Sequence, residues 1–424
     1  MSEVLKKDSE YVWHPFTQMQ TAPEPLEIVR AKDAVLYAAD GKEYIDCNSS
    51  WWVNVHGHGN EHIGNAIAQQ FDQVDHIIFA GATHTKGVEV AERVIKLLPD
   101  HLKKVFFSDN GSTAIEVSLK MVFQYWYNLG EKKIRILALE GAYHGDTFGA
   151  MAVGERDYFN KPFEPFFFDV DFLEFPTKQN ERKLLEQAKL LFQTNEFAAL
   201  ILEPLVQGSA GMRIYSVDFL DKIVSLAKEH NVLVILDEVM TAWGRTGKYF
   251  AFQHSSIVPD IICLSKGLTG GVLPLGLTIA SQEIYNAFLS VDRAKAFLHG
   301  HSFTGNPLSC AAVCASLDLF EKESTWENIR MISASNSRFS QELHSKEIVD
   351  IRVCGTILAI ELKIPGESSY FSEMKDIAYN FFLENGLLIR PLGNVIFINP
   401  PYCITKEQLD KVYDIFKKFI GTLE

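Results

Sequence analysis

Two apolar runs that end in charged side chains decide the fold of this chain: Val232-Leu233-Val234-Ile235-Leu236-Asp237 and Ile261-Ile262-Cys263-Leu264-Ser265-Lys266-Gly267. Each run is short and mostly aliphatic, which is typical of a strand buried on both faces. Such strands belong to mostly parallel sheets, and ligands bind beyond the carboxyl ends of their strands. The two runs therefore predict an α/β fold in which Asp237 and Lys266 lie at the same edge of one sheet.

Further short strands alternate with amphipathic segments along the chain. Val105-Phe106-Phe107 precedes a helical stretch over about residues 113–128, and residues 134–138 and 198–202 follow as strands. This alternation is typical of βαβ units, whose right-handed crossovers place helices on both faces of the sheet. Near the start of the chain, Asp40-Gly41 stands between two apolar runs and predicts a β-hairpin.

We expect three parts in the chain. An N-terminal segment of residues 1–55 packs with the small domain, residues 56–319 form a large cofactor-binding domain, and residues 320–424 form a small C-terminal α+β domain. The boundary near residue 320 rests on a change to charged helical stretches and short strands. A length of 424 residues accommodates this division.

Composition and charge exclude several classes of protein. The formal net charge is −14 and the acidic residues are spread along the chain, whereas a general nucleic-acid or anionic-membrane binder needs a basic face. The first residues lack the apolar core of a signal peptide, and no apolar stretch is long enough for a membrane span. We therefore expect a soluble cytoplasmic protein with reduced cysteines that acts on small molecules.

His56, His58 and His62 with Glu61 suggest a metal site at first sight. Their spacing differs from His-Glu-x-x-His, and the glycines between them indicate a loop rather than a helix. We expect no metal site here.

Asp237 and Lys266 have the clearest chemistry. A carboxylate at the dry edge of a sheet keeps a pyridinium nitrogen protonated, although a carboxylate that merely caps a turn has the same position. A lysine after an apolar run is desolvated, and a depressed pKa makes its amine a Schiff-base nucleophile and a proton shuttle. A surface lysine in a loop is the alternative, and it fits less well beside Asp237. We expect the neighbouring Glu238 to be structural.

Two other strand ends carry candidate cofactor contacts. Gly111-Ser112 opens the helical stretch, and the N–H groups of a helix N-terminus bind anions, although serine there is also simply a good N-cap. Tyr143 follows the strand at residues 134–138, where an aromatic ring either stacks on a flat cofactor or packs in the ordinary way.

At this point the sequence resembles class III aminotransferases over nearly its whole length. The resemblance rests on Leu236-Asp237-Glu238-Val239, Thr241-Ala242-Trp243-Gly244-Arg245-Thr246-Gly247, Pro259-Asp260 and Ser265-Lys266-Gly267. It implies the pyridoxal-phosphate (PLP)-dependent transferase fold type I, with a mostly parallel sheet in a large PLP-binding domain and a smaller α+β domain. It also implies PLP as cofactor and a homodimer with shared active sites.

The resemblance assigns roles to individual residues. Lys266 would hold the cofactor as a Schiff base and carry the proton, and Asp237 would pair with the pyridine nitrogen. Gly111 and Ser112 would hold the phosphate, and Tyr143 would cover the ring. In His299-Gly300-His301-Ser302-Phe303, His301 and Ser302 would contact cofactor, with the Ser302 hydroxyl reaching the phosphate of the neighbouring subunit's PLP.

Three further stretches are similar to the biotin-pathway branch of this class. They are Trp13-His14-Pro15-Phe16-Thr17-Gln18-Met19, Ser49-Ser50-Trp51-Trp52 and the run from Tyr143 to Ala150. The similarity implies that the chain transfers an amino group from S-adenosylmethionine to 8-amino-7-oxononanoate. The similarity implies a substrate site made of Phe16, Trp51, Tyr143, Lys266, Gly300 and Arg390. Arg390 would bind the remote carboxylate, because a guanidinium pairs with it through two hydrogen bonds.

The sequence departs from this branch at positions that leave the donor open. Phe16 replaces a tyrosine, and His301-Ser302 replaces a Pro-Thr pair. Both changes also occur in the lysine-using enzymes of the branch, whereas the paired Trp51-Trp52 fits the S-adenosylmethionine-using enzymes better. Ala242-Trp243, in place of Gly-Phe, makes a bulkier wall. Lysine as donor, or another class III activity on an ω-amine, therefore remains as an alternative.

Overall fold

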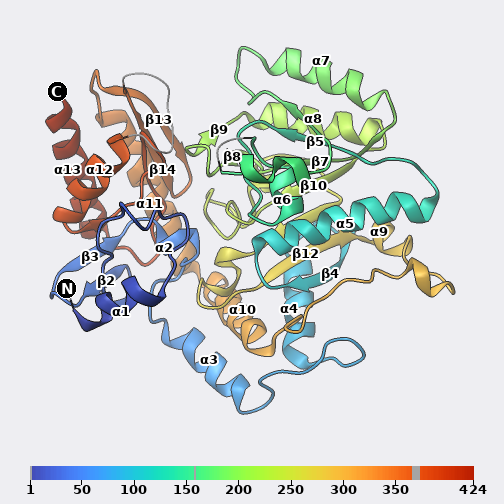
Figure 1. Ribbon diagram of the computed structural model, residues 1–424, viewed down its shortest axis with the longest axis horizontal. Helices are drawn as coiled ribbons and strands as arrows, with labels where there is room; N and C mark the ends of the chain where they lie inside the picture. The colour runs from blue at the N-terminus through green and yellow to red at the C-terminus, as the bar shows by residue number, and fades with distance from the viewer. Residues whose placement is uncertain (1, 157–158, 365–372) are drawn as a thin grey trace.

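The computed structural model describes residues 2–156, 159–364 and 373–424 (Figure 1). At the centre of this described part is a seven-stranded sheet. Its strands, from edge to edge, are β4 (Leu102–Ser108), β12 (Gly276–Ser281), β11 (Ile261–Leu264), β10 (Leu233–Asp237), β7 (Phe197–Leu202), β5 (Arg135–Leu139) and β6 (Val170–Leu173).

The sheet is mostly parallel, as the sequence predicts. β10 runs parallel to β11 and β7, and β5 runs parallel to β7 and β6. Only β12, which the strand pattern did not reveal, is antiparallel to both of its neighbours, β11 and β4. The two apolar runs that predict the fold are thus adjacent strands, β10 and β11, with Leu236 opposite Ile262.

Alternate residues of β10 enter different hydrophobic cores, which is why the whole strand is apolar. Val234 and Leu236 lie in the same core as Phe219 of helix α8 (Val217–Glu229). Ile235 lies in a second core with Ile115 of α5 (Gly111–Leu129). Figure 1 shows α5 across one face of the sheet, and α7 (Glu181–Phe192) beside α8. Helices therefore cover both faces, as expected for a buried parallel sheet.

The N-terminal hairpin joins a late part of the chain. β2 (Val35–Ala38) and β3 (Glu43–Asp46) are antiparallel, which confirms the predicted hairpin, and β1 (Ile28–Lys32) pairs with β2. On its other edge β3 pairs in parallel with β15 (Leu387–Leu388). Figure 1 shows these elements beside the C-terminal helices, with both ends of the chain on this side of the molecule.

A second small sheet consists of β13 (Ile348–Cys354), β14 (Ile357–Leu362) and β16 (Val395–Ile398), covered by α11 (Glu323–Glu342). Helix α10 (Pro307–Phe320) ends close to the predicted boundary at residues 319/320. The division into residues 1–55, 56–319 and 320–424 itself stays a prediction.

The other elements connect these layers. They are α1 (Glu3–Tyr11), α2 (Ser49–Trp52), α3 (Glu61–Phe71), α4 (Thr85–Lys96), α6 (Phe148–Ala152), α9 (Gln282–Asn286), α12 (Glu373–Glu384), α13 (Lys406–Leu423), β8 (Val206–Gln207), β9 (Arg213–Ile214) and the 3-10 helices at Lys161–Phe166, Ala251–His254, Lys266–Thr269 and Arg293–Lys295. None of the helices in the described ranges is both long and apolar enough to cross a membrane.

Candidate active site

A cavity of about 410 Å³ opens beyond the carboxyl ends of the central strands. It is lined by the strand-end residues that the sequence singles out, namely Gly111, Ser112, Tyr143, Asp237 and Lys266. Residues 111 and 112 follow β4, Tyr143 follows β5, and Lys266 follows β11, so the sheet itself brings them together. Their places in the fold are those that a ligand site of a doubly wound sheet requires.

Asp237 is the last residue of β10, and its carboxylate is buried. One carboxylate oxygen accepts a hydrogen bond from the backbone N–H of Val239 at 3.0 Å. The other lies 2.7 Å from Nδ1 of His144, which is itself buried. A carboxylate held by two polar contacts in a dry site keeps a fixed orientation toward the cavity.

Lys266 stands two residues after the end of β11 in a left-handed backbone conformation, with φ of 47°. For a non-glycine residue such a conformation costs about 1–3 kcal/mol, and such residues are enriched at functional sites. Burial lowers the pKa of the Lys266 amine, although Asp237 and Glu203 act in the opposite direction. Within the described part of the chain its Nζ makes no hydrogen bond; it lies 4.8 Å from the centre of the Trp52 ring. The amine is therefore available to a ligand in the cavity.

The N-terminus of α5 offers two free N–H groups to the cavity. The side chain of Asn110, the N-cap, accepts a hydrogen bond from the N–H of Thr113 at 2.9 Å, and its carbonyl accepts one from Ala114 at 3.0 Å. Among the described residues, the N–H groups of Gly111 and Ser112 have no acceptor. Unpaired N–H groups at the positive end of a 19-residue helix attract an anion.

Tyr143 and its neighbours form one hydrogen-bonded unit at the end of β5. The Tyr143 hydroxyl donates to Asp146 at 2.8 Å, and the Tyr143 backbone N–H donates to Oε1 of Glu203 at 3.0 Å. The other oxygen of Glu203 accepts from the N–H of Gly208 at 3.0 Å. Burial raises the pKa of the Tyr143 phenol and raises that of Glu203 to about 7. Glu203 thus ties two segments of the cavity wall together.

Sequence reasoning assigned no role to His144 or Glu203. Both follow predicted strands, at residues 134–138 and 198–202, and this position was the available signal. Glu238, in contrast, is structural as expected. It is buried and accepts hydrogen bonds from the Thr241 hydroxyl and from the N–H groups of Ala251 and Phe252. Burial raises the Glu238 pKa to about 7.

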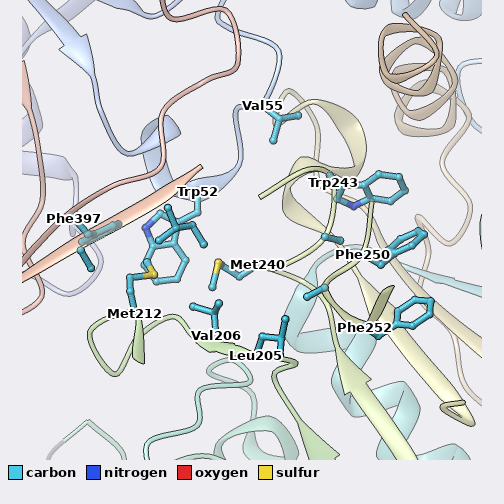
Figure 2. Packing of buried hydrophobic residues seen from close by; sticks show 14 of the residues in the cluster. Trp52, Val55, Leu205, Val206, Met212, Met240, Trp243, Phe250, Phe252 and Phe397 are labelled. Carbon is cyan, nitrogen blue, oxygen red and sulfur yellow. The ribbon is translucent and has the colours of Figure 1, made fainter. Parts of the chain in front are cut away.

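Trp52 forms one wall of the cavity. Figure 2 shows its ring between Phe397 and Met240, and the Trp52 and Phe397 rings are 5.8 Å apart at an angle of 80°. Trp52 belongs to α2, here called the tryptophan turn (Ser49–Trp52). Three of its four residues have positive φ angles, namely 49° at Ser49, 59° at Ser50 and 64° at Trp52.

The predicted substrate residues Phe16, Trp51 and Arg390 form a separate cluster next to the cavity. The rings of Trp51 and Phe16 are 5.6 Å apart. The Arg390 guanidinium carbon lies 4.8 Å from the centre of the Trp51 ring. Trp51 and Phe16 are 42% and 44% exposed, so this cluster is open to solvent, whereas Asp237 in the cavity is buried.

Gly300, His301 and Ser302 do not line the cavity of their own chain. Gly300 and Ser302 are exposed, and the His301 N–H donates to the Thr304 hydroxyl at 3.0 Å. Their predicted contacts with cofactor and substrate stay predictions, because a second subunit would have to bring them to a cavity.

The three histidines that suggested a metal site in the sequence, His56, His58 and His62, have different partners in the structure. His56 is bonded to the Ser316 hydroxyl at 3.0 Å, and burial lowers its pKa to about 3. His58 pairs with Asp46 at 2.9 Å. His62 pairs with Asp318 at 2.8 Å on the surface.

Residues 17–420 match the family described as aminotransferase class III, and the chain belongs to this family. It is 45% identical over 412 residues to the adenosylmethionine-8-amino-7-oxononanoate aminotransferase of Synechococcus elongatus, covering 95% of this chain and 96% of that protein. It is 37% identical to the Staphylococcus aureus enzyme of the same name, covering 99% of this chain and 98% of that protein.

Solved structures give the same result for the fold. The adenosylmethionine-8-amino-7-oxononanoate aminotransferase from Methanocaldococcus jannaschii is similar with a TM-score of 0.93 and 35% identity, covering 99% of this chain and 98% of that one. An amine transaminase from an uncultivated Pseudomonas species, in its PLP-bound form, gives a TM-score of 0.91 at 27% identity, covering 97% and 98%. The predicted PLP-dependent transferase fold type I is thereby confirmed.

Proposed function

We propose that this class III aminotransferase uses PLP to transfer an amino group from S-adenosylmethionine to 8-amino-7-oxononanoate, giving 7,8-diaminononanoate. The observation that carries the proposal is the convergence of a buried carboxylate, a desolvated amine and a free helix N-terminus on one cavity. The names of the similar enzymes supply the substrates.

The residues around the cavity fit PLP group by group. The N–H groups of Gly111 and Ser112 suit a phosphate, because they are unpaired at a helix N-terminus. The Asp237 carboxylate suits a protonated pyridine nitrogen, and the Lys266 amine suits the aldehyde carbon. Tyr143 supplies an aromatic surface for the ring. When bound, PLP supplies an aldehyde that reacts with amines and a protonated ring that withdraws electrons.

Lys266 has two tasks in this proposal. Its amine would hold the cofactor before the donor arrives. Once free, the same amine would take a proton from the donor carbon and, in the second half of the reaction, give a proton to the acceptor carbon. Because burial lowers the Lys266 pKa, a larger fraction of the amine is neutral and able to accept that proton.

Asp237 keeps its position through His144. The contact between Nδ1 of His144 and Oδ2 of Asp237 is 2.7 Å, and both side chains are buried. A fixed carboxylate at this point costs no reorganisation during the reaction. With PLP bound, Asp237 would stabilise positive charge at the ring nitrogen.

The acceptor lies with its reacting end at Lys266 and its carboxylate at Arg390. An aliphatic chain that joins these points would pack against Trp51, Trp52 and Phe16. Tyr143 and the backbone of Gly300 from a second subunit would complete the site. The guanidinium of Arg390 stacks on Trp51 at 4.8 Å, which limits its rotation and presents its N–H groups in one plane.

A homodimer with shared active sites belongs to the same proposal. Gly300, His301 and Ser302 lie outside the cavity of their own chain, and the nearby Leu298 and Phe303 are 79% and 63% exposed. A second copy packed on this surface would bury these apolar side chains and place His301 and the Ser302 hydroxyl at its partner's cofactor phosphate.

A second donor, lysine, is favoured by one observation. Phe16 packs on Trp51 at the substrate cluster and has no hydroxyl to donate or accept a hydrogen bond. A donor that relies on a phenol at this position would bind less tightly.

The test is a transamination assay with 8-amino-7-oxononanoate, in which S-adenosylmethionine and lysine are offered separately. We expect 7,8-diaminononanoate with S-adenosylmethionine, and ping-pong kinetics because the two substrates use one site in turn. Product formed with lysine but not with S-adenosylmethionine would show that lysine is the donor. No product with either donor would overturn the acceptor assignment while leaving a class III aminotransferase.

A further inference from the structure

We propose that Asp46 and His58, two residues outside the cavity, are positioning residues that hold the tryptophan turn (Ser49–Trp52) in its active shape. Neither residue reaches the cavity, and both act through the rings of Trp51 and Trp52. The inference deepens the proposed function, because it concerns how that site binds its acceptor.

The tryptophan turn needs an external support. Ser49, Ser50 and Trp52 all have φ between 49° and 64°, a backbone region that residues other than glycine rarely adopt. A segment of four residues with three such φ angles is strained. A strained backbone persists only where contacts from the surrounding structure stabilise it.

Asp46 supplies this support from the end of β3. Its side chain is fully buried, and its two carboxylate oxygens accept hydrogen bonds from the Ser50 N–H at 2.9 and 2.7 Å. They also accept from the Ser50 hydroxyl at 3.1 Å and from the Asn48 N–H at 3.3 Å. A buried charge with this many donors is satisfied only while the turn keeps its shape.

His58 fixes the carboxylate from the opposite side. Its Nε2 lies 2.9 Å from Oδ2 of Asp46, and its Nδ1 lies 3.1 Å from the side-chain amide nitrogen of Asn54. Because that amide nitrogen is a donor, Nδ1 accepts and Nε2 carries the proton that is donated to Asp46. The His58 backbone also exchanges two hydrogen bonds with Asp33, at 2.8 and 2.9 Å, which locks the residue in place.

The turn presents its two rings to the two ends of the substrate site. The Trp52 ring lies 4.8 Å from Nζ of Lys266, and the Trp51 ring lies 4.8 Å from the Arg390 guanidinium carbon. The side-chain oxygen of the neighbouring Asn48 also accepts the Arg390 backbone N–H at 2.7 Å. A change in the turn would therefore shift the wall beside the reacting amine and the group expected to bind the remote carboxylate.

The first experiment compares Asp46→Asn with the wild-type holoenzyme. Both oxygens of the Asp46 carboxylate accept from the Ser50 N–H, whereas an asparagine amide has only one oxygen that can accept and carries no charge. The turn therefore loses a charged hydrogen bond. We expect the KM for 8-amino-7-oxononanoate to rise about tenfold, with a much smaller change in kcat. The matched control is His62→Gln, which alters a histidine–aspartate pair of similar length (2.8 Å) on the surface and should leave both constants unchanged.

A double-mutant cycle tests whether Asp46 acts through the turn. If it does, Asp46→Asn adds little to the KM of a Trp51→Ala variant, because the ring that it positions is already gone. Fully additive effects, or a KM in Asp46→Asn no higher than in His62→Gln, would overturn the proposal.

His58 provides a second variant in case Asp46→Asn folds poorly. His58→Gln keeps an N–H donor and should retain most of the acceptor affinity, whereas His58→Phe removes the donor and should raise KM as Asp46→Asn does. Equal kinetics for these two His58 variants would contradict the proposed hydrogen bond.

One further measurement does not depend on activity and separates this inference from the proposed function. Acrylamide quenching of tryptophan fluorescence should increase in His58→Phe, because the buried Trp52 becomes accessible. The increase should vanish in a Trp52→Phe background. A wild-type enzyme without activity on 8-amino-7-oxononanoate would refute the proposed function, and unchanged quenching would refute the role of His58.

Discussion

The two halves of the candidate active site are built differently. The inner region consists of Gly111, Ser112, Asp237 and Lys266. The outer region consists of Phe16, Trp51 and Arg390. Inner residues sit at the ends of strands or at a helix N-terminus, whereas outer residues sit on irregular backbone, with a φ of 51° at Phe16.

This difference separates the chemistry from the choice of substrate. Buried strand ends hold charged groups in fixed positions, which a reaction shared by a whole family requires. Loops on the surface of such a scaffold tolerate change and carry specificity. Changes in the inner region should therefore affect all substrates alike, and changes in the outer region should affect one substrate at a time.

The largest expected effect belongs to Lys266→Ala. Removing the amine takes away both cofactor attachment and proton transfer, so we expect turnover to fall by at least about 10³-fold with every donor and acceptor. The visible absorbance band of the attached cofactor should disappear as well. Full activity in this variant, measured by product formation, would show that the inner region is assigned wrongly.

Glu203→Gln tests how a buried carboxylate in the cavity wall beside the inner region affects stability. The folded-state pKa of Glu203 is about 7, against an ordinary value of 4.5. The folded protein therefore binds more protons between these values, and the stability that Glu203 contributes below about pH 4.5 is lost as the pH rises through 7.

In Glu203→Gln, the fall in the free energy of unfolding between about pH 5 and pH 8 should shrink by up to roughly 3 kcal/mol. Urea unfolding at several pH values measures this difference. Glu186→Gln, at an exposed i,i+4 ion pair, serves as control and should leave the pH profile unchanged. Parallel profiles for all three proteins would contradict the buried, titrating carboxylate.

Arg390→Lys tests the outer region alone. An ammonium cannot form the two parallel hydrogen bonds of a guanidinium, so the KM for 8-amino-7-oxononanoate should rise about tenfold. Two-substrate kinetics should show little change in the KM for the donor, and Arg182→Lys on the surface should change neither. Equal increases for donor and acceptor would place Arg390 at a shared part of the site.

Phe16→Tyr should give the smallest effect. The new hydroxyl lies beside Trp51, and one hydrogen bond to S-adenosylmethionine would lower its KM by about threefold to tenfold. The KM for lysine should stay the same. A lower KM for lysine instead would indicate that lysine is the donor that binds beside residue 16.

The inner region was predictable because its signals are local. Asp237 and Lys266 directly follow apolar runs, and Gly111-Ser112 directly precedes an amphipathic stretch, so the pattern alone predicted one shared sheet edge. The preference of short buried strands for a parallel sheet predicted that both runs belong to one sheet, whereas their direct pairing as β10 and β11 became visible only in the structure.

Other features depend on contacts that no local pattern reveals. His144 and Asp237 are 93 residues apart, and the pairing of β3 with β15 joins the two ends of the chain. The antiparallel β12 follows Gly270-Gly271 and Pro274, which signal a turn, but no local pattern shows that the next strand runs in the opposite direction. Positive φ angles at serine and tryptophan are likewise invisible in the sequence, because these residue types normally avoid them.

The tryptophan turn and the adjacent Asn48 also bind a part of the chain that is synthesised last, which has a consequence for biosynthesis. The Asn48 side chain donates to the carbonyl of Phe397, 349 residues later, and Ser49 donates to Asn399. At a synthesis rate of about 5–20 residues per second, residue 48 waits roughly 20–70 seconds on the ribosome for these partners. The central strands, between residues 102 and 281, are complete well before then. We therefore expect the substrate-selecting wall to be the last part of the nascent enzyme to take shape.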